Sequence, residues 1–328
     1  MKPLHTATPL WESRALTAAL GAPVLLKMEP LQLTGCFKIR GIGYACQARR
    51  KAGAIRLISS SGGNAGYAVA YAGRKLGIDV TVFVPKSTSS WMRELIRGEG
   101  ATVVEHGVSW DDAHAHASEL ASQDNEAAYI HPFEDPQIWS GHASIVEEIE
   151  ATGPKPGAIV LSVGGGGLLC GVMEGLHRVN WTDVPVVAVE TEGAASFAAS
   201  VAAGHLVTLD KITSIATSLG ARTVASEALF WTRRHSIIPW TVSDRAAIDA
   251  CMRFATDHRI LVEPACGAAL STVYDQAEPL VGREPLLVIV CGGAGVNIPL
   301  LKEWDSQVPR DTNDSAQSFP HRNSACCE

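Results

Sequence analysis

The sequence lacks the features by which several large classes of protein are recognised. No run of apolar residues is long enough to cross a bilayer, so no membrane partner is expected. The first residues, MKPLHTATPLWESRAL, contain no apolar stretch of the kind found in a secretory signal peptide. The net charge is −7 and no basic stripe is present, so nucleic acid is not an expected partner either.

The eight cysteines also lack the spacing of a redox or metal motif, because none belongs to a C-x-x-C pair. Most lie within apolar runs, which favours reduced thiols and a cytoplasmic protein over a disulfide framework. With 328 residues and 46% hydrophobic content, the chain can build one large core or two medium ones. The polar end of the sequence has no periodicity, and residues 306–328 are expected to be a disordered tail.

From residue 53 onward, short β-branched runs such as AIRLISS and DVTVFVP alternate with helical runs such as NAGYAVAYAGRKLG. This alternation predicts βαβ units and an α/β fold with two open, twisted, mainly parallel sheets. The early strand PVLLKME is expected to join the second sheet. We therefore predict a large domain of residues 1–36 and 137–305 and a small domain of residues 37–136.

Three predicted strands end in glycine-rich turns, SSSGGNAG, SVGGGGLL and VIVCGGAG. Ligands bind beyond the carboxyl ends of parallel strands, so these turns could line one crevice. Gly164 to Gly167 stand between a strand and a helix, where free N–H groups and the helix dipole suit a phosphate; a tightly packed turn is the alternative. The turn SSSGGNAG suits a carboxylate, although Ser61 and Asn64 could instead cap the following helix.

Two common phosphate-binding motifs do not fit the four glycines. A P-loop would continue with Lys and Ser or Thr, but Leu168 and Leu169 follow. A G-x-G-x-x-G fingerprint fails because its last position falls on Leu169 or Cys170. Glu190 ends the next strand, where an NAD enzyme could hold ribose, so a dinucleotide remains an alternative.

The segment LTGCFKIRG places Lys38 in an apolar frame at the start of a predicted helix. Burial, the helix N-terminus and nearby Arg40 should lower its pKa and leave an amine that can form a Schiff base or act as a base. Gly41 and Ala45, on the same helical face, could leave room for a flat ring on which Phe37 stacks. A surface lysine is the alternative, but a lysine beside a phosphate cradle predicts pyridoxal 5′-phosphate, PLP.

Several motifs together resemble the PLP-dependent L-serine/L-threonine dehydratases of fold type II, especially serine dehydratase and its serine dehydratase-like relative. They include TGCFKIRGIG, SSGGNAG, SVGGGGLLCGV, AVETEGAASF, ILVEPACGAAL and VIVCGG, in order from about residue 4 to residue 300. The resemblance implies a cofactor in the cleft between two domains and a homodimer. It also implies α,β-elimination, which would convert L-serine to pyruvate and L-threonine to 2-oxobutyrate, each with release of ammonia.

The resemblance also implies a role for each motif residue. Lys38 would be the Schiff-base lysine and the general base, Phe37 would stack on the ring, and Cys291 would face the pyridine nitrogen. Asn64 would bind the 3′-oxygen of the cofactor. The cofactor phosphate would be held by Gly164, Gly165, Gly166, Gly167 and Leu168. The substrate carboxylate would be held by Ser61, Gly62, Asn64 and Ala65. A monovalent cation, usually potassium, would be bound by Glu190 and by the carbonyls of Gly164, Ala194, Leu219 and Ala221.

Three positions depart from the family pattern or divide its branches. Cys36 stands where the family usually has Ser before Phe-Lys, so a hydroxyl near the lysine is missing. The family continues CGG with one residue and then Asn, whereas CGGAGVN stands here, which implies a longer or rearranged loop after Cys291. Gly62 favours the dehydratase-like branch over the one with Ala.

Other functions remain open at this point. Within the fold they are serine racemase, cysteine synthase-like β-replacement and threonine synthase. FKIRG argues against β-replacement, where an acidic residue is expected after the lysine. No acidic side chain stands out as the second acid that a racemase needs, or as a proton donor to the hydroxyl that leaves in elimination. Beyond the fold they are an NAD-dependent dehydrogenase, which would need the missing fingerprint, and an inactive binding protein, against which an intact Lys38 argues.

Overall fold

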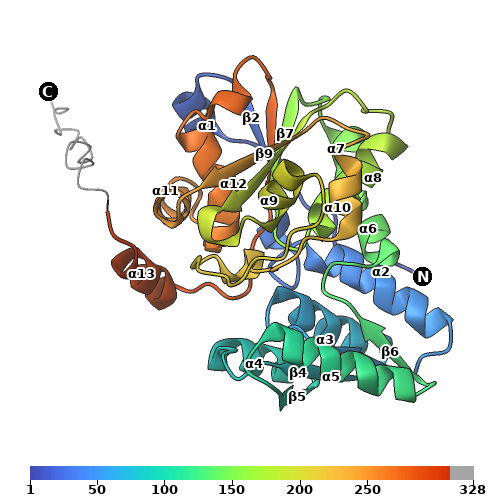
Figure 1. Ribbon diagram of the computed structural model, residues 1–328. Coiled ribbons are helices and arrows are strands. Elements are labelled where there is room, and N and C mark those ends of the chain that lie inside the picture. The colour runs from blue at the N-terminus through green and yellow to red at the C-terminus, as the bar shows by residue number, and fades with distance from the viewer. Residues whose placement is uncertain (311–328) are drawn as a thin grey trace, which may run out of the picture.

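The computed structural model describes residues 1–310, which fold around two separate sheets (Figure 1). The larger sheet has the order β1-β2-β10-β7-β8-β9. Its strands are β1 (Leu10–Glu12), β2 (Val24–Met28), β7 (Ala158–Ser162), β8 (Val186–Thr191), β9 (Ile237–Val242) and β10 (Leu286–Val290). The smaller sheet has the order β5-β4-β3-β6, and its strands are β3 (Arg56–Ser59), β4 (Asp79–Val84), β5 (Thr102–Glu105) and β6 (Ala127–Ile130).

All strand pairs are parallel except β1 with β2. Every residue of β7, β8 and β10 is buried, as expected for parallel strands that are covered on both faces. Continuous runs of Val, Ile and Leu form such strands because their branched side chains pack well on a pleated surface. The predicted α/β class with two mainly parallel sheets is confirmed.

Helices cover the faces of both sheets (Figure 1). Around the larger sheet lie α1 (Arg14–Leu20), α7 (Ser144–Thr152), α8 (Gly167–Arg178), α9 (Ser196–Ala203), α10 (Ser226–Trp231), α11 (Asp244–His258) and α12 (Pro264–Tyr274). Around the smaller sheet lie α3 (Asn64–Leu76), α4 (Ser90–Gly98) and α5 (Trp110–Gln123). The helices α2 (Lys38–Lys51) and α6 (Pro136–His142) pack against each other between the two sheets.

Each sheet has its own apolar core. The larger core joins strand residues such as Val160 and Val288 to α12, all of whose residues are buried. In the smaller core, Ile39 and Ile42 of α2 pack with Leu57 of β3. The predicted domain boundary at residues 136 and 137 falls at the start of α6, which contacts both α2 and α8. The division into two domains at this point remains a prediction.

The end of the chain differs from expectation. The tail was predicted from residue 306, but helix α13 (Ile298–Gln307) continues past that point. The rest of the predicted tail from residue 311 lies outside the described residues. No helix among residues 1–310 is both long and apolar enough to span a membrane.

Candidate functional site

A cavity of about 610 Å³ lies between the two sheets, within the usual size range of small-molecule sites. All the residues expected to hold the cofactor or the substrate carboxylate line it. They are Phe37, Lys38, Ser61, Gly62, Asn64, Ala65, Gly164, Gly165, Gly166, Gly167, Leu168 and Cys291. The three glycine-rich turns therefore meet in one place because each follows the carboxyl end of a parallel strand, β3, β7 or β10.

The four-glycine turn between β7 and α8 has no room for side chains. A Cβ on Gly165 would lie 2.2 Å from the ring of Phe133, and one on Gly164 would lie 2.9 Å from Cα of Leu219. Gly166 has a left-handed backbone with φ of 84°, which a residue with a side chain rarely adopts. Among residues 1–310, no protein group accepts a hydrogen bond from the N–H groups of Gly165, Gly166 and Gly167. This arrangement fits an anion such as a phosphate at the start of α8.

Lys38 is the first residue of α2, and its side chain faces the cavity. Its Nζ donates a 2.7 Å hydrogen bond to the carbonyl of Pro132 and lies 5.3 Å from the ring centroid of Phe37. Burial lowers the pKa of Lys38 to about 8, while the thiols of Cys36 and Cys291 act in the opposite direction. The alternative of a surface lysine is therefore excluded.

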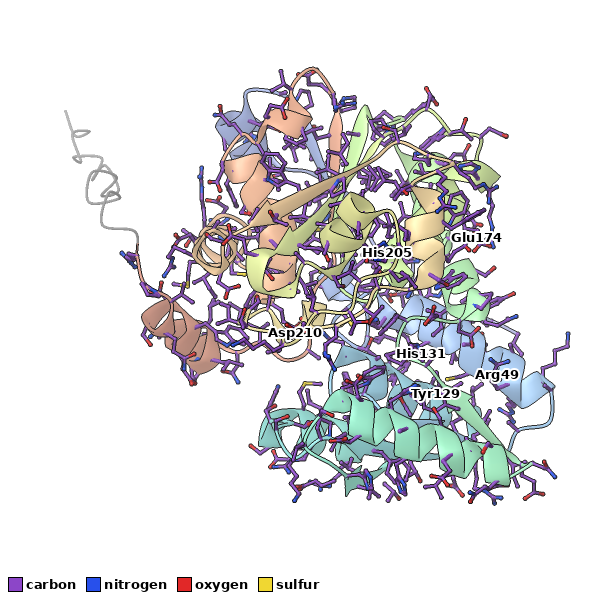
Figure 2. The ribbon with its side chains drawn as sticks, viewed as in Figure 1. Arg49, Tyr129, His131, Glu174, His205 and Asp210 are labelled. Atoms are coloured by element: carbon purple, nitrogen blue, oxygen red, sulfur yellow. The ribbon has the colours of Figure 1, made fainter. Side chains whose placement is uncertain are left out.

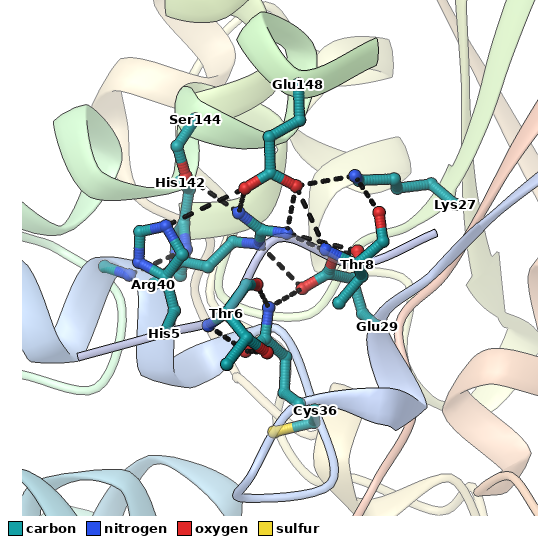
Figure 3. Close-up of polar contacts among 12 residues, drawn as sticks. His5, Thr6, Thr8, Lys27, Glu29, Cys36, Arg40, His142, Ser144 and Glu148 are labelled. Carbon is teal, nitrogen blue, oxygen red and sulfur yellow. Dashed lines mark hydrogen bonds and ion pairs between the residues drawn. The ribbon is translucent and has the colours of Figure 1, made fainter. Parts of the chain in front are cut away.

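Two details predicted around Lys38 are wrong. Arg40 does not contribute to the low pKa of Lys38, because its guanidinium is paired with the carboxylates of Glu29 and Glu148 in a buried cluster (Figure 3). Gly41 does not make room for a ring, since a Cβ there would lie 2.4 Å from the carbonyl oxygen of Ile138 in α6. Ala45 is buried in the smaller core, away from the cavity lining.

The turn between β3 and α3 presents Ser61, Gly62, Asn64 and Ala65 to the cavity. Asn64 does not cap α3, which has Gly63 as its N-cap and no side-chain cap bond. Ser61 Oγ accepts a 3.3 Å hydrogen bond from the N–H of Gly63. A Cβ on Gly62 would lie 2.3 Å from Oγ1 of Thr88, so only a glycine lets Thr88, which also lines the cavity, pack this closely against the turn.

The amide of Asn64 is bound instead by residues on the larger-sheet side. Its Nδ2 donates to Glu263 at 3.0 Å and 3.2 Å, and its Oδ1 accepts from the N–H of Ala294 at 2.8 Å. Glu263 lines the cavity, is buried, and has a pKa raised by burial. Sequence reasoning missed Glu263, although an acidic residue inside the apolar run ILVEPACGAAL was a usable signal.

Cys291 follows β10 and lines the cavity as a buried neutral thiol. A hydrogen bond with Cys266 and burial raise the pKa of Cys291 well above its usual value. Burial likewise raises the pKa of Cys36 to about 12. The long loop CGGAGVN reaches towards the smaller sheet, since the carbonyl of Ala294 accepts a 3.1 Å hydrogen bond from Nε1 of Trp91 in α4.

The residues predicted to bind a cation lie partly outside the cavity. Gly164, Leu219 and Ala221 line it, but Glu190 and Ala194 do not. Glu190 is fully buried at the end of β8, where its oxygens accept hydrogen bonds of 2.9 Å and 2.8 Å from the N–H groups of Phe197 and Ala198. Burial raises the pKa of Glu190 to about 7.

One further polar group lies six residues after Glu190. Ser196 Oγ is buried and has no hydrogen-bond partner among residues 1–310. Buried polar groups are normally paired, so this hydroxyl is a candidate ligand for a bound ion. The sequence analysis did not identify it.

The polar side chains behind the cavity wall hold its loops in place. His131 Nδ1 accepts from the N–H groups of Phe133 and Glu134 at 3.2 Å and 2.7 Å, and burial lowers the pKa of His131 to about 3. Tyr129 Oη lies 2.6 Å from Ser60 Oγ and 2.7 Å from His114 Nδ1. Figure 2 shows Tyr129 and His131 where the two parts of the chain meet. A neutral His131 is not available as an acid near pH 7.

Comparisons with known proteins agree with these features. A family model described as pyridoxal-phosphate dependent enzyme matches residues 1–292. An L-serine dehydratase/L-threonine deaminase of Homo sapiens is 49% identical over 316 residues, which cover 94% of this chain and 96% of that protein. The crystal structure of an L-serine ammonia-lyase from the fungus Rhizomucor miehei is similar with a TM-score of 0.88 and 39% identity, over 93% of this chain and 99% of that one. A maize serine racemase is similar with a TM-score of 0.84 and 25% identity, over 93% of each chain.

Proposed function

The chain belongs to the family of pyridoxal-phosphate dependent enzymes, and from this premise we propose that it is an L-serine/L-threonine ammonia-lyase. It converts L-serine to pyruvate and ammonia, and L-threonine to 2-oxobutyrate and ammonia. The observation that carries this proposal is the amine of Lys38, whose pKa is lowered to about 8 in a cavity that also contains the anion-binding turn. The whole chain is also more similar to the fungal ammonia-lyase than to the maize serine racemase.

The residues of the cavity fit the cofactor. Lys38 would hold its aldehyde carbon, the turn from Gly164 to Leu168 would hold its phosphate, and Phe37 would contact the ring. Asn64 would bind the 3′-oxygen, and the neutral thiol of Cys291 would meet the pyridine nitrogen. When bound, PLP supplies the electron sink that makes the Cα proton of an amino acid acidic.

The protein's own groups would then position the substrate and move protons. The N-terminus of α3 and the residues Ser61, Gly62, Asn64 and Ala65 would orient the substrate carboxylate. Lys38 would take the Cα proton, since a pKa of about 8 leaves part of its amine neutral near pH 7. The carbonyl of Pro132, 2.7 Å from Nζ, would steady the resulting ammonium.

A monovalent cation, potassium, is part of the proposal. Glu190 is a buried carboxylate with a raised pKa and no basic partner among residues 1–310, and a cation would stabilise its ionised form. The unpartnered hydroxyl of Ser196 supports an ion nearby. The carbonyls of Gly164, Ala194, Leu219 and Ala221 would complete the site, and Gly164 would link it to the phosphate turn.

The proposed assembly is a homodimer, and light scattering of the purified protein tests it directly. A reducing compartment such as the cytoplasm is proposed for the protein. Within residues 1–310 the cysteines are free and buried, which supports this setting.

The function is tested by measuring keto acid and ammonia formed from L-serine, L-threonine and D-serine in potassium and lithium buffers. For L-serine and for L-threonine, we expect one keto acid to be formed for each ammonia released. D-serine should give much less of both products. The rates should be higher in potassium than in lithium. Accumulation of D-serine from L-serine without keto acid would identify a racemase instead. A purified protein with no visible absorbance after incubation with PLP would contradict the cofactor assignment.

A further inference from the structure

The side-chain amide of Asn64 is held from the far side of the cavity. Asn64 begins α3 beside the smaller sheet, whereas its partners Glu263 and Ala294 lie 199 and 230 residues further along the chain. Glu263 takes the Nδ2 end of the amide and the N–H of Ala294 takes the Oδ1 end. These contacts leave only one orientation of the amide, because a flipped amide would point Oδ1 at a carboxylate and Nδ2 at an N–H donor.

Glu263 is built into this position. Its Oε2 accepts a 2.7 Å hydrogen bond from Oγ of Ser218, and its Oε1 accepts a 2.8 Å hydrogen bond from the N–H of Gly295. Together with Asn64 Nδ2, these three donors suit an acceptor-only carboxylate. A Cβ on Gly293 would lie 2.1 Å from Cδ of Glu263, so the carboxylate fits only because a glycine stands there.

The unusual loop after Cys291 is therefore shaped around Glu263 and Asn64. Gly293 provides the space, Ala294 binds the amide oxygen of Asn64, and Gly295 binds the carboxylate of Glu263. Three consecutive residues of the loop thus contribute to the orientation of one side chain. The residues of CGGAGVN therefore have a structural role that the sequence did not reveal.

The orientation of Asn64 has a chemical consequence. An amide can offer a ring oxygen either a donor, through Nδ2, or an acceptor, through Oδ1. The two oxygens of Glu263 lie at similar distances from Nδ2 and can share one of its N–H groups, which leaves the second N–H for the cavity. A donor at the 3′-oxygen of the cofactor favours the ionised form of that oxygen.

We propose that Glu263 is a positioning residue, which fixes the amide of Asn64 so that Nδ2–H donates to the 3′-oxygen of bound PLP. This inference rests on the proposed function, because it assumes that Asn64 contacts that oxygen. It goes further by assigning a task to a buried carboxylate to which the proposed reaction gives no other role.

The test is the pH dependence of the visible absorbance of the holoenzyme. Glu263→Met removes both oxygens that accept from Asn64 Nδ2 and keeps the length of the side chain. The Asn64 donor should then turn away from the 3′-oxygen. Without a donor this oxygen ionises less readily, so the pH midpoint of the visible absorbance should rise by about one unit, and PLP should bind about tenfold more weakly. Removal of a negative charge alone would lower the midpoint, so the direction of the shift separates positioning from a simple charge effect.

A double-mutant cycle shows whether Glu263 acts through Asn64. In the Asn64→Ala background, Glu263→Met should neither raise the midpoint nor weaken PLP binding further. Glu263→Asp keeps the charge but shortens the side chain, and it should also raise the midpoint. Cys251→Ala is the matched control, because its thiol donates to the backbone carbonyl of Glu263, at 3.3 Å, and not to the carboxylate, so its removal should leave the spectrum unchanged.

Two outcomes overturn the inference. One is a wild-type midpoint and affinity, or a lowered midpoint, in Glu263→Met. The other is an equal rise of the midpoint in Glu263→Met with and without Asn64. If the wild-type protein itself shows no visible absorbance with PLP, the proposed function fails rather than the role of Glu263.

Discussion

Arg40 and Glu29 form a fully buried ion pair, in which Nε lies 2.7 Å from Oε2 and Nη2 lies 2.8 Å from Oε1 (Figure 3). Glu148 of α7 adds a second carboxylate, 2.7 Å from Nη1, and Lys27 of β2 lies 2.6 Å from Glu148. Arg40 is only two residues from Lys38. The cluster therefore ties the start of α2, and with it the amine of Lys38, to the larger sheet.

Arg40→Ala should be strongly destabilising, because it leaves two carboxylates without their main partner. We expect the free energy of unfolding in urea to fall by roughly 3–5 kcal/mol. Arg56→Ala is a suitable control, since the Arg56–Asp124 pair is largely exposed and should contribute much less to stability. An equal loss in the two variants would show that the buried cluster does not hold α2 in place.

The lowered pKa of Lys38 predicts how the cofactor-free protein takes up PLP. Only the neutral amine is a nucleophile, and burial places the pKa of Lys38 at about 8 rather than 10.5. The second-order rate of appearance of the visible absorbance should therefore rise about tenfold per pH unit below pH 8 and then level off. A rate that continues to rise to pH 10 would indicate an ordinary solvated lysine.

Glu190 predicts a stabilising effect of potassium that depends on pH. Burial raises the pKa of Glu190 to about 7 from 4.5, so the folded protein holds this proton more tightly than the unfolded chain does. The stability that this group contributes is present below about pH 4.5 and is lost as the pH rises through 7. Potassium should offset the loss by pairing with the carboxylate.

We therefore expect potassium to raise the melting temperature, relative to lithium, by about 2–4 °C at pH 8 and by much less at pH 5. The comparison is made by differential scanning fluorimetry of the wild-type protein and of Glu190→Gln. The variant should show no pH-dependent difference between the two salts. If it responds to potassium as the wild type does, Glu190 is not a ligand.

Cys291 predicts the balance between elimination and competing reactions. A neutral thiol is a weak partner for a pyridine nitrogen and leaves it largely unprotonated. Cys291→Ser should keep PLP and retain activity within roughly tenfold, because a hydroxyl makes a similar neutral hydrogen bond. Cys291→Asp should protonate the nitrogen and divert L-serine towards D-serine or transamination products. Unchanged product ratios and spectrum in Cys291→Asp would show that this residue does not face the ring.

The parts of the fold predicted correctly are those whose signal is local. The apolar runs of β7 and β10 are buried on both faces, so their hydrophobicity alone identified them. Strand β9 was missed because it is only partly buried and contains Pro239, which is tolerated at the edge of a sheet. Helix α13 was missed since Leu301 is its only buried residue.

The candidate site divides in the same way. The glycine turn and Lys38 could be predicted because a strand, a turn and a helix that follow one another determine where they lie. The ion pairs of the Arg40 guanidinium could not be predicted, since its partner Glu148 is 108 residues away in the sequence. The role of Glu263 depends on a contact with Asn64 across 199 residues, and only the folded chain brings the two together.

The central claim is that Lys38 is the amine that holds the cofactor and moves the substrate proton. Borohydride reduction of the PLP-loaded protein, followed by peptide mass spectrometry, tests it most directly. We predict one phosphopyridoxyl-labelled peptide, with the label on Lys38, and loss of both the label and keto-acid formation in Lys38→Ala. A label on another lysine, or a Lys38→Ala protein that keeps its visible absorbance and turnover, would contradict the account.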